Sequence, residues 1–117
     1  GEASLHFVDQ PHGAINSLGI RVEEAGKSAV YAIDFHEMTP AMANLYAGAD
    51  LWISDCLRRT PHPSHAHLDA VLQWASDLNV GQLYLTHMGN GLDYATLVAE
   101  LPDWAAPAHD GLEIELR

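Results

Sequence analysis

Short apolar runs, separated by turns rich in Gly, Pro and Asp, divide the chain into predicted strands and helices. Strands are predicted near residues 3–9, 17–25, 28–33, 50–54, 81–86, 105–108 and 111–116. Helices are predicted near 40–47, 65–78 and 93–101. The first three strands follow one another without a helix, and later strands alternate with helices. This order predicts an N-terminal meander followed by β-α-β crossovers, in one continuous α/β unit.

The clearest helix is the central one. Leu68, Val71, Leu72, Ala75 and Leu78 recur at helical spacing, so the helix should cover a sheet with one apolar stripe. Pro63-Ser64 just before it is a plausible start and N-cap. That start would place His65 in the first helical turn, where free backbone N–H groups attract anions.

Three residues with metal-binding side chains stand where predicted strands end. His87 closes the run Gly81-Gln-Leu-Tyr-Leu-Thr, Asp34 closes Ser28-Ala-Val-Tyr-Ala-Ile, and His12 lies in the short loop Pro11-His-Gly. In α/β folds, functional groups gather at the carboxyl ends of strands. Imidazole and carboxylate ligands from separate loops suit zinc and similar ions, and a carboxylate can bridge two of them. Asp34 is therefore the candidate bridge.

A second group of candidates lies between residues 55 and 65. Arg58 or Arg59 could pair with a phosphate, although a surface ion pair is the alternative. His62 could line the same pocket through the loop His-Pro-Ser-His. Asp55 could accept a hydrogen bond from a metal-bound histidine, or only fix its own loop. His6, His36 and His109 are expected to be ordinary hydrogen-bonded or exposed histidines.

Composition limits the choice of function. The formal net charge of −11, from 16 acidic and 5 basic residues in 117, disfavours broad binding to nucleic acid. No apolar run approaches the roughly 20 residues that span a bilayer, so a cytoplasmic protein without membrane attachment is expected. The single cysteine, Cys56, lies in an apolar run and is expected to be a buried thiol rather than a nucleophile.

Several segments resemble the metallo-β-lactamase superfamily, in particular its phosphodiesterase branch, which includes phosphoribosyl cyclic-phosphate phosphodiesterase and is related to tRNA-processing RNase Z. They are Gln10-Pro-His-Gly, Leu18-Gly-Ile-Arg, Tyr31-Ala-Ile-Asp, Asp50-Leu-Trp-Ile-Ser-Asp, His62-Pro-Ser-His, Leu85-Thr-His-Met and His109-Asp-Gly-Leu-Glu-Ile. Their order is similar to the second half of that family's domain and covers nearly the whole chain. The resemblance implies an αβ/βα sandwich with a mixed sheet and covering helices.

The same resemblance implies roles for individual residues. His12 and His87 would each bind one metal ion of a pair, and Asp34 would bridge the two ions. His65 would be the catalytic histidine, which donates a proton to the leaving oxygen or steadies the phosphate. Two divalent ions, zinc or manganese, would serve a small cyclic phosphate or related ester.

The family's His-x-His-x-Asp-His pattern, which supplies most metal ligands, does not occur in these residues. The chain starts at Gly1, and we expect residues 1–117 to be the C-terminal part of a longer domain, inactive alone and partnered by its N-terminal half. One alternative is a non-catalytic half-domain that acts as an interaction module or homodimer through exposed sheet edges and apolar surface. Another is RNase Z-like RNA processing, which would require a basic element from outside these residues.

Overall fold

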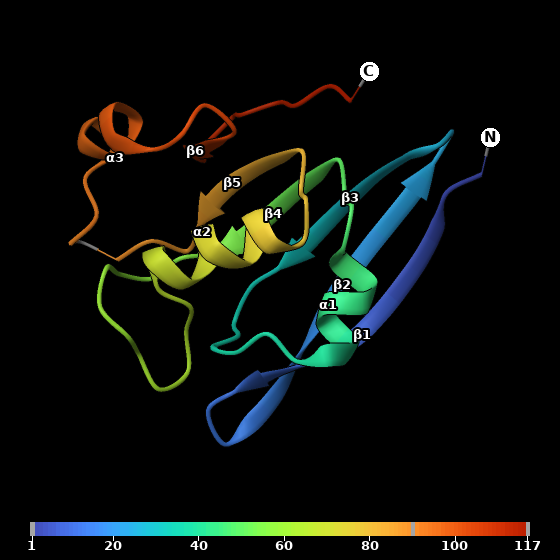
Figure 1. Ribbon diagram of the computed structural model, residues 1–117, viewed down its shortest axis with the longest axis horizontal. Coiled ribbons are helices and arrows are strands. Elements are labelled where there is room, and N and C mark those ends of the chain that lie inside the picture. The colour runs from blue at the N-terminus through green and yellow to red at the C-terminus, as the bar shows by residue number, and fades with distance from the viewer. Residues whose placement is uncertain (1, 90, 117) are drawn as a thin grey trace.

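The computed structural model describes residues 2–89 and 91–116 and contains one mixed sheet with three helices (Figure 1). The elements, in chain order, are β1 (Ser4–His12), β2 (Ile15–Glu24), β3 (Lys27–Ala32), α1 (Pro40–Tyr46), β4 (Leu51–Asp55), α2 (Leu68–Asp77), β5 (Gln82–Thr86), α3 (Tyr94–Glu100) and β6 (Ala105–Pro107). The predicted α/β class and mixed sheet are confirmed.

The spatial order of the strands is the order in the chain, β1 to β6. β1, β2 and β3 pair antiparallel, whereas β3 to β6 pair parallel through crossover segments. β1 therefore runs in the same direction as β3, β4 and β5. The carboxyl ends of these four strands meet at one edge of the sheet, which is where the sequence places its metal-binding residues.

The helix starts follow from their capping residues, with one correction. Thr39 caps α1 by accepting from the Met42 N–H, and Asp93 caps α3 by accepting from the Thr96 N–H. The predicted start of the central helix at residue 65 is wrong, because α2 begins at Leu68. The preceding residues instead form a loop closed at its base, where the Leu57 N–H donates to the Ala66 carbonyl and the Leu68 N–H to the Arg58 carbonyl.

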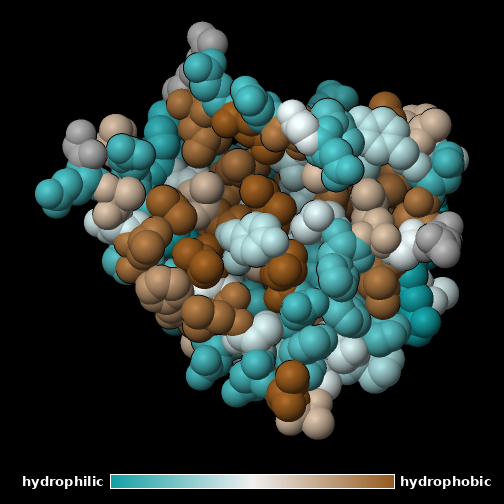
Figure 2. All heavy atoms as spheres, turned by 180° about the vertical axis from the view of Figure 1, so that it is seen from behind, coloured by the Kyte–Doolittle hydropathy of each residue, from teal (hydrophilic) through white to brown (hydrophobic). Residues whose placement is uncertain are grey.

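One face of the sheet is covered and the other is not. The core under the helices includes Tyr46 of α1, Val71 of α2 and Trp52 of β4, all fully buried. On the opposite face, strand register aligns a row of apolar residues across the sheet: Phe7, Ile20, Tyr31, Ile53 and Tyr84. Figure 2 shows apolar side chains gathered on this side of the molecule.

The uncovered face is exposed to a degree that is uncommon for a sheet interior. Phe7 is 55% exposed and Tyr31 is 44% exposed, and Leu5 and Leu18 beside them are also more than half exposed. We call this surface, made by Leu5, Phe7, Leu18, Ile20, Tyr31, Ile53 and Tyr84, the apolar face. A contiguous apolar surface on a folded unit commonly marks a contact with another part or partner.

The predicted strand over residues 111–116 is wrong. Asp110 and Gly111 do form a turn, but the residues after it belong to no strand of the described sheet. A strand needs a neighbouring strand to complete its hydrogen-bond ladder, and β6 pairs only with β5. Leu112, Ile114 and Leu116 remain half-buried, and Leu116 lies near Val22 and Ala29 on the side of the apolar face. Among the described residues, no helix has the length and apolar character of a membrane span.

Candidate metal centre

The sequence-predicted metal-binding residues lie at or just beyond the carboxyl ends of three strands that run in the same direction, β1, β3 and β5. His12 is the last residue of β1, Asp34 follows β3 by two residues, and His87 directly follows β5. Asp34 and His87 both have left-handed backbones, with φ of 58° and 56°. Non-glycine residues rarely adopt this conformation, which is enriched at functional sites. It turns each chain sharply at the sheet edge and aims the side chain along that edge.

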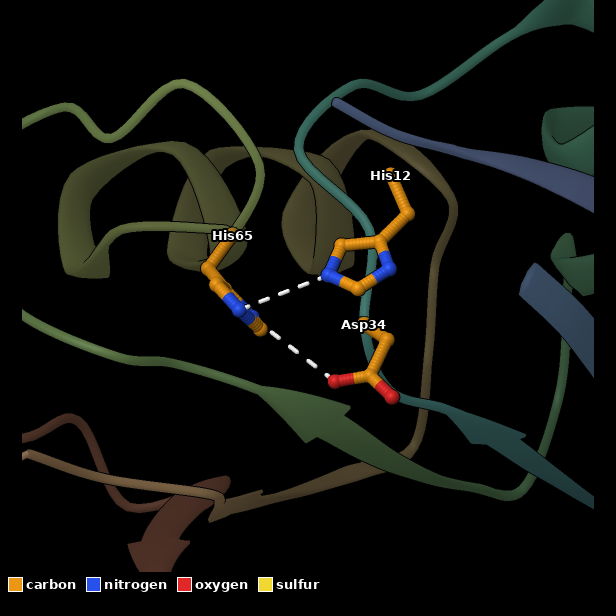
Figure 3. Close-up of side chains that lie close together, drawn as sticks. All are labelled: His12, Asp34 and His65. Atoms are coloured by element: carbon orange, nitrogen blue, oxygen red, sulfur yellow. Dashed lines mark hydrogen bonds and ion pairs between the residues drawn. The ribbon is translucent and has the colours of Figure 1, made fainter. Parts of the chain in front are cut away.

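His65 lies between the other candidate residues and belongs to the loop before α2 that backbone hydrogen bonds close at its base. Figure 3 shows His12, Asp34 and His65 converging from three separate segments. The His12 and His65 Nε2 atoms are 3.5 Å apart, and His65 Nδ1 is 3.8 Å from Asp34 Oδ1. On the other side, the His87 ring stacks on His65 with centroids 5.1 Å apart, and His87 Nε2 is 3.6 Å from Asp34 Oδ1.

These distances group the donor atoms into two overlapping sets. His12, Asp34 and His65 form one, and Asp55, His65 and His87 form the other, with the ligand atoms of each set within 4.8 Å of one another. The structure thus brings all three predicted ligands together with His65. The metal-binding and catalytic roles of these four residues stay predictions, since proximity alone does not assign them.

Asp55 contacts the site from beneath, as the last residue of β4. Its side chain is fully buried, and Oδ2 accepts from the Asp34 N–H at 3.1 Å and from His65 Nδ1 at 2.8 Å. Oδ1 has no hydrogen-bond partner among the described residues. Burial raises the pKa of Asp55, and its hydrogen bond to His65 opposes that rise. The partner of Asp55 is therefore His65, not one of the histidines predicted to bind metal.

The loop residues predicted to contact substrate divide into two groups. His62 lies beside His65, with ring centroids 5.2 Å apart, and its Nδ1 accepts from the Ser64 N–H. Partial desolvation, together with nearby Arg58 and His65, lowers the pKa of His62 and favours its neutral form. His62 is thus placed to reach a molecule bound near His65.

The two arginines have other partners. Arg58 donates to the backbone carbonyls of Thr60 and Pro61 and so stiffens the loop that carries His62 and His65. Arg59 forms an exposed ion pair with Glu100 on α3, as in the alternative that the sequence left open. Their binding of substrate stays a prediction.

His36 is hydrogen-bonded, as expected, but the sequence did not predict that it joins two segments of the site. Its backbone N–H donates to the Pro11 carbonyl at 3.0 Å, and its Nδ1 accepts from the Gly13 N–H at 3.3 Å. This pair of bonds clips the His12 turn to the Asp34 loop. Next to it, fully buried Phe35 packs between Trp52 and Trp74 and anchors the same loop in the core. No sequence signal marks His36, because its partners are distant backbone groups.

Comparison with known proteins identifies the protein family of this chain. A family model described as the beta-lactamase superfamily domain matches residues 1–88. The chain belongs to the metallo-β-lactamase superfamily, which the sequence resembles. A search of curated protein sequences gave no match.

Solved structures agree with the family over nearly the whole chain. A diphosphatase from the PhnP family is 32% identical, with a TM-score of 0.88 over 98% of this chain and 44% of that one. Zn²⁺-bound PqqB from Methylobacterium extorquens is 19% identical, with a TM-score of 0.77 over 97% of this chain and 50% of its own. The short form of human tRNase Z is 18% identical, with a TM-score of 0.76 over 97% and 43%. The chain thus spans about half the length of these relatives.

Proposed function

We propose that this chain supplies part of the active site of a metal-dependent hydrolase that cleaves a phosphodiester, with a small cyclic phosphate or related ester as substrate. One observation carries the proposal. His12, Asp34, His65 and His87, from four separate segments, converge at the carboxyl edge of the sheet with their ligand atoms in two sets of three. The similarity to a diphosphatase of the PhnP family supports a phosphate compound as the substrate class.

The residues present fit a divalent ion. Two ligands about 2.0–2.1 Å from a tetrahedral zinc ion lie about 3.4 Å apart. The 3.6 Å between His87 Nε2 and Asp34 Oδ1 is close to that spacing. Nitrogen and carboxylate donors suit zinc or manganese equally. Asp34, whose ligand atom lies within 4.8 Å of that of His12 and 3.6 Å from His87 Nε2, would be the residue that two ions share.

Three ligands are too few to hold two ions, since each normally needs at least three from protein. We propose that the remaining ligands come from an N-terminal half-domain outside residues 1–117. Two features support this: the chain spans about half of its relatives, and its apolar face exposes more than half of Leu5, Phe7 and Leu18. An apolar sheet face of this kind is normally covered by a second layer of the same domain.

Bound divalent ions would polarise the substrate phosphate and activate water. The chain's own residues would provide proton transfer and orientation. Asp55 holds His65 through Nδ1, so Nε2 is the ring nitrogen that faces the site. From there, His65 can donate a proton to the departing oxygen. His62 and the Arg58-stiffened loop would line the substrate side, and Arg59 could join them only by leaving Glu100.

The test compares this chain with a version extended upstream through the His-x-His-x-Asp-His segment expected there. Metal content is measured by mass spectrometry, and hydrolysis is measured with bis(p-nitrophenyl) phosphate. We expect the extended protein alone to hold about two ions and to turn over. Strong activity of residues 1–117 alone would refute the half-site, and absence of metal and activity from both would refute the hydrolase.

His65 is tested in the extended protein by His65→Gln. If His65 is the acid, the variant keeps about two ions and loses activity by about 10²-fold or more. Loss of one ion instead would assign His65 as a ligand and leave the acid unassigned. Asp34→Asn is the matched control, since removing the bridge should lower metal content as well as activity.

The apolar face supports a second candidate, a non-catalytic interaction module that pairs with a partner or with another copy. A mass that rises with concentration, in a chain without metal affinity, would favour it. RNase Z-like processing is supported by the fold similarity to human tRNase Z. However, the net charge of −11 means that the basic surface for RNA would have to lie outside this chain.

A further inference from the structure

The loop that carries Asp34 is held from outside the metal centre by a series of hydrogen-bonded side chains, of which Gln10 and Tyr46 are fully buried and Ser17 is partly buried. Ser17, on β2, donates from Oγ to the Asp34 carbonyl at 2.6 Å. Gln10, on β1, donates from Nε2 to Ser17 Oγ at 3.0 Å and to the Ile33 carbonyl at 2.9 Å. Tyr46, on α1, donates its hydroxyl to Gln10 Oε1 at 2.5 Å. The hydrogen-bond network therefore connects α1, through side chains of β1 and β2, to the backbone of Asp34.

Most of this hydrogen-bond network lies in the core. Gln10 and Tyr46 are fully buried, and burial raises the pKa of the Tyr46 phenol, so its hydroxyl keeps its proton. Gly19 leaves the space for the hydroxyl, since a Cβ there would lie 1.6 Å from the oxygen. A buried amide and hydroxyl are costly unless every polar atom has a partner. Both polar atoms of the Gln10 side chain, Nε2 and Oε1, have hydrogen-bond partners.

The Asp34 backbone needs this support for two reasons. Its φ of 58° is a conformation that a non-glycine residue holds only when its surroundings fix it. It also lies beyond the end of β3, so the sheet ladder does not hold its carbonyl or its N–H. Ser17 holds the carbonyl and Asp55 holds the N–H.

We propose that Ser17, Gln10 and Tyr46 are positioning residues for Asp34: they hold its backbone in the left-handed conformation that aims its carboxylate at the metal ions. The role of the metal ions rests on the proposed function. The contacts of Ser17, Gln10 and Tyr46 with the Asp34 loop, which we call the Asp34 clamp, are present in residues 1–117 alone. None of the three touches the metal-binding atoms. Their effect is transmitted through the Asp34 carbonyl.

The test measures the loop directly, by amide hydrogen exchange of Asp34 and His36 in residues 1–117 without metal. Ser17→Ala should speed exchange at both amides by about tenfold, since the hydrogen bonds from the Ser17 hydroxyl to the Asp34 and Ile33 carbonyls are lost. Tyr46→Phe should act in the same direction and more weakly, and Ser17→Thr, which keeps a hydroxyl, should restore protection. Exchange in α2 should change by less than twofold in each variant.

Val71→Ala in α2 is the control for a purely structural effect, because Val71 is a fully buried core residue whose apolar side chain makes no hydrogen bond to this loop. It should lower the melting temperature without selective exchange at Asp34 and His36. The proposal is overturned if Ser17→Ala and Val71→Ala have the same exchange pattern, or if the wild-type Asp34 amide has no protection.

Cobalt(II) titration of the same variants, followed by visible absorption in the extended protein, gives the consequence for metal binding. Ser17→Ala should weaken cobalt binding by about tenfold, and Val71→Ala should leave it unchanged. Selective exchange without any change in cobalt affinity would overturn the positioning role. If wild-type protein binds no cobalt, the hydrolase proposal fails, and hydrogen exchange alone decides whether Asp34 is held by this clamp.

Discussion

Substitution of Gly19 by alanine tests the packing that surrounds the Asp34 clamp. An alanine Cβ would lie 1.6 Å from the Tyr46 hydroxyl oxygen and 2.6 Å from Gln10 Oε1, both fully buried side chains. Tyr46 must move to make room, which breaks its hydrogen bond to Gln10. Overpacking costs about 1–3 kcal/mol, and a buried acceptor left without its donor costs about 1–3 kcal/mol.

The expected net loss is about 3 kcal/mol, because alanine in a strand recovers about 0.5–1 kcal/mol of the entropy cost of glycine. That is a large part of the stability of a domain of this size. Urea unfolding followed by the fluorescence of Trp52 and Trp74, both packed in the core, measures it.

A double-mutant cycle with Tyr46→Phe identifies the cause. Tyr46→Phe removes the oxygen nearest to the added Cβ, whereas the contact with Gln10 Oε1 at 2.6 Å stays. Gly19→Ala should therefore still destabilise that background, but by about 2 kcal/mol less than it destabilises the wild type. Costs that add within about 0.5 kcal/mol would refute the reasoning, because the clash with the hydroxyl would then not be the source of the loss.

Further predictions concern three other parts of the molecule: His36, Cys56 and the apolar face. His36→Ala should weaken cobalt binding several-fold, because the Gly13 N–H loses its acceptor. His36→Asn should restore cobalt binding, since Asn Oδ1 can replace Nδ1 as the acceptor. Equal cobalt affinities of the wild type and His36→Ala would show that the contact between His36 and Gly13 does not support the site. Burial raises the pKa of the Cys56 thiol to about 12, so a disulfide reagent at pH 8 should label folded protein at least about 100-fold more slowly than unfolded protein. The unfolded thiol ionises first, near its ordinary pKa of 9.0, so stability should fall as pH rises from 9 towards 12, a trend checked by urea midpoints. Phe7→Glu with Tyr31→Glu should abolish concentration-dependent association in analytical ultracentrifugation at little cost in stability, since both side chains are about half exposed; unchanged association would exclude the apolar face as the contact.

Much of the candidate site could be predicted because strand ends leave a local signal. The apolar runs before Asp34 and His87 stop abruptly at a polar residue, and parallel strands place their carboxyl ends together, so the meeting of these residues with His12 follows from topology. The partner of Asp55 and the function of His36 could not be predicted. Both depend on a loop conformation in which the contacts join residues at least ten positions apart.

The two incorrect elements have a related cause. In residues 111–116, apolar and polar side chains alternate as in a strand. A strand also needs a neighbouring strand for its backbone hydrogen bonds, and no strand of the described sheet pairs with these residues. Residues 65–67 precede an apolar helical stripe, but backbone bonds from Leu57 and Leu68 hold that segment in the loop instead. In one segment the absence of a pairing strand, and in the other the presence of bonds to distant backbone, decided the conformation over the local pattern.

By itself, the sequence determined the class of fold, the order of its elements and which residues stand at strand ends, because these depend on hydrophobic periodicity and on turn and cap residues near in the chain. Only the tertiary structure decided that Asp55 pairs with His65, that Arg59 pairs with Glu100, and that Tyr46, Gln10 and Ser17 together hold the backbone of Asp34. Those pairings require angstrom-scale placement of groups distant in the chain, and side-chain spacing along the chain does not encode such distances.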